Sequence, residues 1–141
     1  HDGVPLLDHP HAPDLAYETL IATCAQASYY VTRTIATATD DFYARDFPVT
    51  FSDDAKLLHF TFESGDKTQR LIAVWNPQTL VDGIADVKSD LTVPGLRASQ
   101  GWVTDTFNGT EQELDLSTEG QDTLIKRLLI KDYPTLIRLK K

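Results

Sequence analysis

The sequence predicts an all-β protein, an antiparallel β-sandwich of seven or eight strands preceded by one amphipathic helix near the N-terminus. Two observations support this prediction. From residue 47 onward apolar and polar residues alternate, as in Leu58 to Phe62 and Val87 to Val93, and successive side chains of a strand point to opposite faces of a sheet. Tight-turn signals separate these runs. The Asn108-Gly109 pair predicts a two-residue hairpin turn of type I′, which needs positive φ at both residues.

The N-terminal helix is predicted from its start signal and from one apolar stripe. Pro13 and Asp14 suit the first turn of a helix, because proline lacks the N–H that would be unpaired there and a carboxylate favours that end of the dipole. The stripe recurs at helical spacing and consists of Tyr17, Leu20, Ile21 and Cys24. We expect the helix to end near residues 26–27. Such a stripe must be buried, either on the sandwich or on a neighbouring domain.

The remaining elements follow in chain order. Residues 29–36 are rich in aromatic and β-branched side chains and predict a first strand, whereas the acidic residues 37–46 predict a loop. Residues 71–75 are nearly all apolar, as expected for a central strand that is covered on both faces. Counted from residue 47 onward, the seven or eight strands of the sandwich are residues 71–75 and the runs expected at residues 47–51, 58–63, 87–93, 102–107, 111–117, 123–130 and 135–139.

Composition excludes several classes of protein. The net charge is −8 over 141 residues, which argues against a nucleic-acid partner because the phosphate backbone would meet an acidic surface. No apolar run approaches the roughly 18 residues that predict a membrane span, so no membrane partner is expected. The only cysteine, Cys24, cannot form an internal disulfide and is expected to be a buried thiol. The chain begins with His1 and lacks Met, so we expect a processed or excised piece. Both an extracellular and a cytoplasmic location stay open.

Motifs at both ends of the chain resemble a known protein family. Residues 2–5 have the sequence DGVP, residues 13–20 PDLAYETL, residues 73–75 AVW, residues 108–114 NGTEQEL and residues 128–139 LLIKDYPTLIRL. These motifs resemble the last barrel helix and the C-terminal β-sandwich of clan-A-type glycoside hydrolases, among them β-xylosidase and endoglycanase relatives. The resemblance covers residues 30–52 poorly.

The resemblance implies a division of the chain and a partner. Residues 1–27 would be a loop and the end of a preceding barrel, and residues 28–141 would be the sandwich domain. Such enzymes carry their two catalytic glutamates on barrel strands, so the resemblance implies no catalytic residue in this chain. The partner would be the catalytic barrel of the same parent chain, and the helix stripe would form the interface with it.

Two aromatic residues are the candidates for ligand binding. Trp102 follows Gly101 at the start of a predicted strand, and Tyr133 precedes Pro134 at a strand break. Either ring could stack on a sugar, whose axial C–H face is apolar, whereas Trp75 lies in an apolar run and is expected in the core. If one of them binds sugar, the chain is a carbohydrate-binding module whose partner is a polysaccharide. A second alternative is an immunoglobulin-like interaction domain unrelated to sugars.

Metal and modification sites are judged by their spacing. Two groups of residues could offer metal ligands. The first, a candidate for zinc, is Asp8, His9 and His11, and it lacks a third and a fourth ligand. The second, a candidate for calcium, lacks EF-hand spacing, and we predict no metal and no cofactor. The second group consists of Asp40, Asp41, Asp53, Asp54 and Asp86. The triplet from Asn108 to Thr110 satisfies the glycosylation sequon, but a tight turn explains the same residues better.

Overall fold

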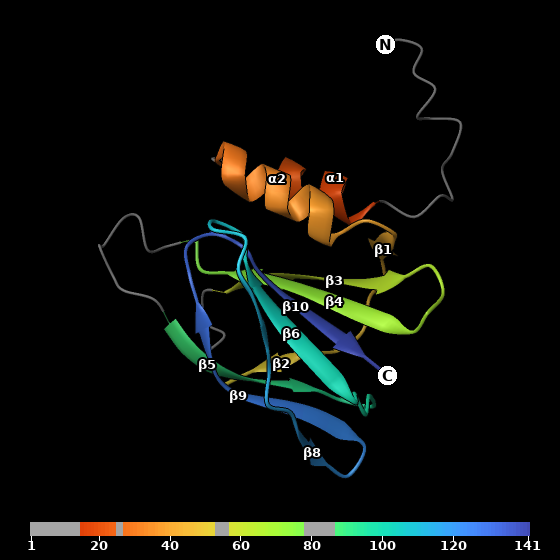
Figure 1. Ribbon diagram of the computed structural model, residues 1–141. Coiled ribbons are helices and arrows are strands. Elements are labelled where there is room, and N and C mark those ends of the chain that lie inside the picture. Colours follow the sequence, from red (N-terminus) through yellow and green to blue (C-terminus); the bar gives the residue numbers. More distant parts are fainter. Residues whose placement is uncertain (1–14, 25–26, 53–56, 78–86) are drawn as a thin grey trace.

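The computed structural model describes residues 15–24, 27–52, 57–77 and 87–141. Two antiparallel sheets pack face to face, and two helices lie over the outer face of one of them (Figure 1). The six-stranded sheet has the order β1-β3-β4-β10-β6-β7, and the four-stranded sheet has the order β2-β5-β9-β8. The predicted all-β sandwich is confirmed, with ten strands and two helices among the described residues.

The elements have the following bounds in chain order: α1 Ala16–Thr23, α2 Tyr29–Ala38, β1 Phe42–Ala44, β2 Thr50–Phe51, β3 Leu58–Ser64, β4 Gln69–Trp75, β5 Val87–Val93, β6 Gln100–Asp105, β7 Glu111–Glu113, β8 Ser117–Glu119, β9 Asp122–Ile130 and β10 Thr135–Lys140. No described helix has the length and apolar content that crossing a membrane requires.

The main core lies between the two sheets. Alternate residues of β4 and β10 point inward, and the inward residues of β5 and β9 meet them from the four-stranded sheet. All five residues from Leu71 to Trp75 are buried, which confirms the prediction that this strand is covered on both faces. The buried residues of this core include Ile72, Val74, Leu91, Val93, Ile125, Ile130, Ile137 and Leu139.

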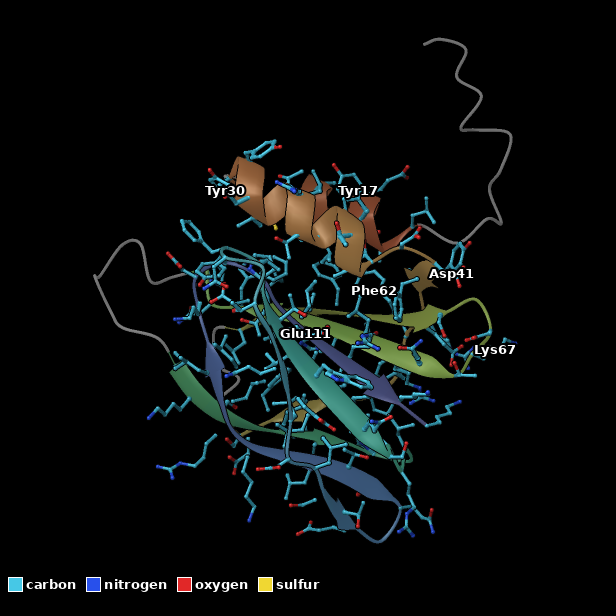
Figure 2. The ribbon with its side chains drawn as sticks, viewed as in Figure 1. Tyr17, Tyr30, Asp41, Phe62, Lys67 and Glu111 are labelled. Atoms are coloured by element: carbon cyan, nitrogen blue, oxygen red, sulfur yellow. The ribbon has the colours of Figure 1, made fainter. Side chains whose placement is uncertain are left out.

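A second core lies between the six-stranded sheet and the two helices, which we call the helical layer. Leu20 of α1 and Ile35 of α2 are fully buried there. They pack over outward-facing residues of the sheet, and Phe62 lies between the sheet and the helices (Figure 2). The sheet residues in this core are Phe42, Phe62, Leu71, Ala73, Trp75 and Leu136. The apolar stripe of α1 therefore covers the sandwich of its own chain.

The prediction of a strand at residues 29–36 is wrong, because Tyr29–Ala38 is helix α2. Aromatic and β-branched composition favours strands, but two features favour the helix. Ser28 is its N-cap and accepts a hydrogen bond at its Oγ from the Val31 N–H at 3.1 Å. Val31 and Ile35 lie one turn apart and are both buried on the sheet.

Other boundaries also differ from the predictions. Helix α1 ends at Thr23, before the predicted end, and the predicted loop at residues 37–46 contains β1. The predicted strand 111–117 is two short strands, β7 in the six-stranded sheet and β8 in the four-stranded sheet. The chain passes from one sheet to the other at residues 114–116, where Leu114 and Leu116 pack against the main core.

The turn at Asn108-Gly109 does join two antiparallel strands, β6 and β7, but it is not of type I′. Of the two residues, Gly109 alone has a positive φ, +76°. The Gly109 N–H donates to the Asp105 carbonyl at 2.8 Å, so the loop is longer than two residues. Asn108 instead accepts hydrogen bonds at its side-chain oxygen from the Thr110 N–H and hydroxyl.

The four strands at the sheet edges are the shortest in the described part of the chain. The six-stranded sheet ends in β1 and β7 with three residues each, and the four-stranded sheet ends in β2 with two and β8 with three. Every residue of β7 and β8 is exposed.

Some predictions fall on residues that are not described, and the division at residues 27 and 28 stays a prediction. The predictions outside the described residues are the motif at 2–5, the helix start at Pro13 and Asp14, and the metal candidates Asp8, His9, His11, Asp53, Asp54 and Asp86.

Candidate functional site

Trp102 lies on the outer face of β6, directly beside Arg138 of β10. The guanidinium carbon of Arg138 is 4.0 Å from the centre of the indole, which is cation–π geometry. Two neighbours hold this guanidinium: Arg138 donates to Gln69 Oε1 at 2.8 Å and to Glu111 Oε2 at 3.4 Å. One face of the Trp102 ring is therefore occupied by a fixed cation of the same chain. A ligand could use this face only after Arg138 moved, and a sugar platform at Trp102 stays a prediction.

Tyr133 lies in the connection between β9 and β10 and is half-buried. Its hydroxyl donates to Asp105 Oδ2 at 3.0 Å, and its ring centre is 5.6 Å from that of Phe107. Tyr133 and Phe107 line a cavity of about 470 Å³ with Val31, Leu58 and Trp75. Trp75 is buried, as predicted for a core residue. Tyr133 thus borders this cavity, and its role in ligand binding stays a prediction.

The predicted interface stripe faces the six-stranded sheet. Leu20 is fully buried, and three residues pack partly buried around the same core: Tyr17, Ile21 and Cys24. Burial raises the pKa of the Cys24 thiol above its ordinary value of 9.0, so the thiol stays protonated and is a poor nucleophile at neutral pH. A contact of this stripe with another domain stays a prediction.

A groove of about 600 Å³ lies between α2 and the loop that joins β6 to β7. Figure 1 shows this loop rising from the sheet toward the helix. The helix contributes Tyr30, Arg33 and Thr34, and the loop contributes Phe107, Asn108 and Gly109. Tyr30 is 60% exposed and Phe107 is 54% exposed. Two large aromatic side chains from distant parts of the sequence therefore line one open groove.

The sequence predictions did not include Tyr30 or Phe107. For Tyr30 a signal was present in the sequence. With Ser28 as the N-cap of α2 and with Val31 and Ile35 on its buried side, Tyr30 does not lie on the buried side of the helix. For Phe107 no local signal exists, because its position beside α2 depends on pairing between β6 and β10.

We call Tyr29, Tyr30, Phe107 and Tyr133 the aromatic end. The ring centres of Tyr29 and Tyr30 are 5.5 Å apart.

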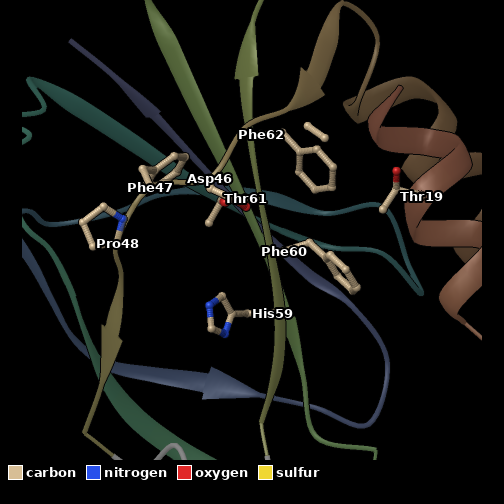
Figure 3. Close-up of a pocket in the computed structure, with 9 residues that line it drawn as sticks. Thr19, Asp46, Phe47, Pro48, His59, Phe60, Thr61 and Phe62 are labelled. Atoms are coloured by element: carbon tan, nitrogen blue, oxygen red, sulfur yellow. The ribbon is translucent and has the colours of Figure 1, made fainter. Parts of the chain in front are cut away.

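Another groove, of about 560 Å³, borders β3 (Figure 3). His59 and Thr61 point to one side of the strand, and Phe60 and Phe62 point to the other side, toward Thr19 of α1. The groove contains one imidazole and one carboxylate, from His59 and Asp46. Across the described residues no three His, Cys, Asp or Glu side chains lie close enough to hold a metal ion. The groove thus has neither a metal-ligand set nor the pair of carboxylates that glycoside hydrolysis uses.

Comparisons with known proteins complete the description of the site. No family model and no curated protein matches the sequence. Among solved structures, part of the alpha-L-fucosidase isoenzyme 2 from Paenibacillus thiaminolyticus is similar, with a TM-score of 0.46 and 7% sequence identity. The match covers 65% of this chain and 15% of that enzyme. A similarity of this size identifies neither a family nor an activity.

Proposed function

We propose that the chain is a non-catalytic C-terminal β-sandwich domain of a glycoside hydrolase, which packs against the catalytic barrel and supports it. The sequence resemblance at residues 108–114 and 128–139 supports this proposal. These residues form β7, the last three residues of β9 and most of β10, and β10 lies between β4 and β6 within the six-stranded sheet. Leu128, Ile130, Leu136, Ile137 and Leu139 are all buried. The apolar residues of the second motif thus build the core of the domain, whereas the first motif forms the exposed strand β7 and the loop before it.

The observation that carries the proposed contact is the exposure of apolar side chains on the helical layer. Tyr29 is 71% exposed and Leu15, the N-cap of α1, is 42% exposed. Leu15 bridges Tyr43 of β1, and Tyr29 is the first residue of α2, so the two exposed side chains belong to different helices of the layer. We assign the barrel contact to this outer side of the layer, because the predicted stripe of α1 is turned toward the sheet.

The proposal is tested in the full-length parent protein. We expect its upstream coding sequence to show alternating strands and helices, and removal of residues 15–141 to lower the melting temperature of the barrel. Replacing Leu15 and Tyr29 with Ser should lower that temperature by about 2–4 °C for each kcal/mol of stabilisation that the two side chains provide. Leu129 is a matched control, because it is 40% exposed on β9 of the four-stranded sheet. A Leu129→Ser variant should melt as the wild type does. An upstream sequence without that alternation, or equal melting of both variants and the wild type, contradicts the proposal.

A further inference from the structure

The groove between α2 and the loop joining β6 to β7 has the form of a ligand site. Its volume, about 600 Å³, falls within the range of small-molecule sites, roughly 300–1,000 Å³. The loop comes close to the helix at Gly109. A Cβ atom built on this glycine would be 3.7 Å from Thr34 Oγ1 of α2, which is van der Waals contact. Both walls are regular or well-braced structure, because Asp105 accepts hydrogen bonds from the Phe107 and Asn108 N–H groups. The groove is therefore shaped before any ligand arrives.

The aromatic rings of this groove are supported from behind. Phe107 contacts Tyr133, with ring centres 5.6 Å apart, and Tyr30 contacts Tyr29, with ring centres 5.5 Å apart. Such pairs orient the rings and limit their rotation. Aromatic side chains with few rotatable bonds offer large contact areas at a low entropy cost. More than half of the Tyr30 and Phe107 side-chain surface nevertheless faces solvent. The rings are oriented in advance and left available.

The guanidinium of the groove can only donate hydrogen bonds, and the hydroxyls of Tyr30, Thr34 and Thr37 can both donate and accept them. The Arg33 guanidinium provides five N–H donors and no acceptor, and none of the described residues forms an ion pair with it. Asn108 uses its side-chain oxygen to hold Thr110, which leaves its amide N–H groups to donate outward. No carboxylate of the described residues lines the groove, although the chain as a whole has a net charge of −8. The groove thus suits a ligand that is rich in oxygen acceptors and has an apolar face.

We propose that this groove binds a pyranose ring of an oligosaccharide. A pyranose combines an apolar C–H face with a rim of hydroxyl oxygens. The C–H face would stack on Phe107 or Tyr30, whose ring faces carry partial negative charge. The rim oxygens would accept hydrogen bonds from Arg33 and Asn108, and a carboxylated sugar would gain a bidentate contact with Arg33. This inference goes beyond the proposed function, because a domain that only supports a barrel needs no groove of this kind.

The test measures binding of defined oligosaccharides to the 141-residue chain. The probes are xylohexaose, cellohexaose and mannohexaose as neutral sugars, and trigalacturonate as an acidic one. Isothermal titration calorimetry gives the dissociation constant, and amide NMR spectra show which residues respond. We expect at least one probe to bind with a dissociation constant between about 10 μM and 1 mM, and to shift the amide signals of Thr34, Asn108 and Gly109. A carboxylate preference that is lost in Arg33→Gln would identify the acidic sugar as the better ligand.

Matched variants separate this groove from other exposed apolar surface. Phe107→Ala and Tyr30→Ala should each weaken binding about tenfold or more, and the thermal melting of each variant shows that it is folded. Leu129→Ala is the control, because Leu129 is 40% exposed on β9 of the four-stranded sheet and does not line the groove; it should change the affinity less than about twofold. Absence of binding by all four probes at about 10 mM overturns the proposal. So does full affinity in folded Phe107→Ala. Neither result bears on the barrel contact, which is tested at Leu15 and Tyr29 in the parent protein.

Discussion

The outer face of the six-stranded sheet has a covered half and an open half, and they are built differently. The covered half lies under the helical layer and consists of apolar residues of β3, β4 and β10, such as Phe62 and Leu71. The open half lies on the far side of β10 and on β6 and β7, where Trp102, Arg138 and Glu111 face outward. The boundary runs through β10, whose Leu136 is buried and whose Arg138 is half-exposed.

The difference shows two ways to shield an aromatic ring on a sheet. Phe62 is shielded by two helices, which form a second core with the sheet. Trp102 is shielded by one side chain, because the Arg138 guanidinium lies over its ring while Gln69 and Glu111 hold the charged end near water. Arginine can cover apolar surface with its stem and keep its charge hydrated. The open half thus needs no covering element to avoid a large apolar patch.

The largest effect is expected from Phe62→Ala in the covered half. Phe62 is fully buried between sheet and helices, and removing a buried phenyl ring costs about 3–5 kcal/mol of unfolding free energy through reduced burial and a cavity. Urea denaturation measures this change. The comparison variant is Phe107→Ala, which should be destabilised by less than about 1 kcal/mol because its ring is more than half exposed. Similar destabilisation of the two variants would mean that the helical layer does not seal the sheet.

A smaller effect is expected from Arg138→Ala in the open half. The change removes the cation from the Trp102 ring and takes the charged donor away from Gln69 and Glu111, so we expect the unfolding free energy to fall by about 1–2 kcal/mol. In a Trp75→Phe background the fluorescence of Trp102 should also shift to longer wavelength as water reaches the ring. Arg138→Lys keeps the charge without the planar fork and should give an intermediate result. An unchanged emission spectrum in Arg138→Ala would show that the guanidinium does not cover the ring.

The helical layer itself is probed by Ser28→Ala, which removes the N-cap of α2. The Val31 N–H then has no side-chain acceptor, and removing such a cap typically costs about 1 kcal/mol. Ser28→Asp keeps an acceptor at the same position and should restore stability. The readout is the unfolding free energy in urea. If Ser28→Ala and Ser28→Asp proved equally stable, the cap would contribute nothing to the layer.

The smallest effect concerns the hairpin between β3 and β4 and depends on pH. The Thr68 N–H and the Ser64 and Thr68 hydroxyls donate to the Asp66 carboxylate, and these bonds lower its pKa from 3.8 to about 2. Because the folded-state pKa is below the unfolded value, the stability it contributes is fully present above about pH 4 and is lost as the pH falls through about 2. We expect Asp66→Asn to be slightly less stable than the wild type at about pH 6, and the difference to shrink toward about pH 2. A difference that stays constant over this range would contradict the ionic origin of the effect.

Most strands of the sandwich can be predicted from the sequence, because the alternation of apolar and polar residues along a strand is visible within a few neighbouring positions. Leu58 to Phe62, Val87 to Val93 and Leu71 to Trp75 all form the predicted strands. The helix α2 was missed because composition and periodicity disagree over residues 29–36. The buried pair at Val31 and Ile35 and the cap at Ser28 outweigh the β-branched composition, since burial against the sheet contributes more than local propensity.

The candidate site was less predictable than the fold. Tyr133 could be predicted to lie at the edge of the sandwich, because it precedes Pro134 at a break between two predicted strands. The covering of Trp102 by Arg138 depends on the register between β6 and β10, which no local pattern specifies. The meeting of Tyr30 and Phe107 depends on how α2 lies over the sheet, and these residues are 77 positions apart in the sequence. Sites formed by such distant segments become visible only when the fold is known.

The short strands at the four sheet edges bear on how the protein behaves at high concentration. An exposed edge is a template on which another chain can add a strand and begin to aggregate. Here each edge strand offers only two or three residues, and three of those on β7 and β8 are glutamates, Glu111, Glu113 and Glu119. A second copy that paired with these edges would gain few main-chain bonds and would bring like charges together. The sandwich is therefore protected against edge-to-edge polymerisation without a closed barrel.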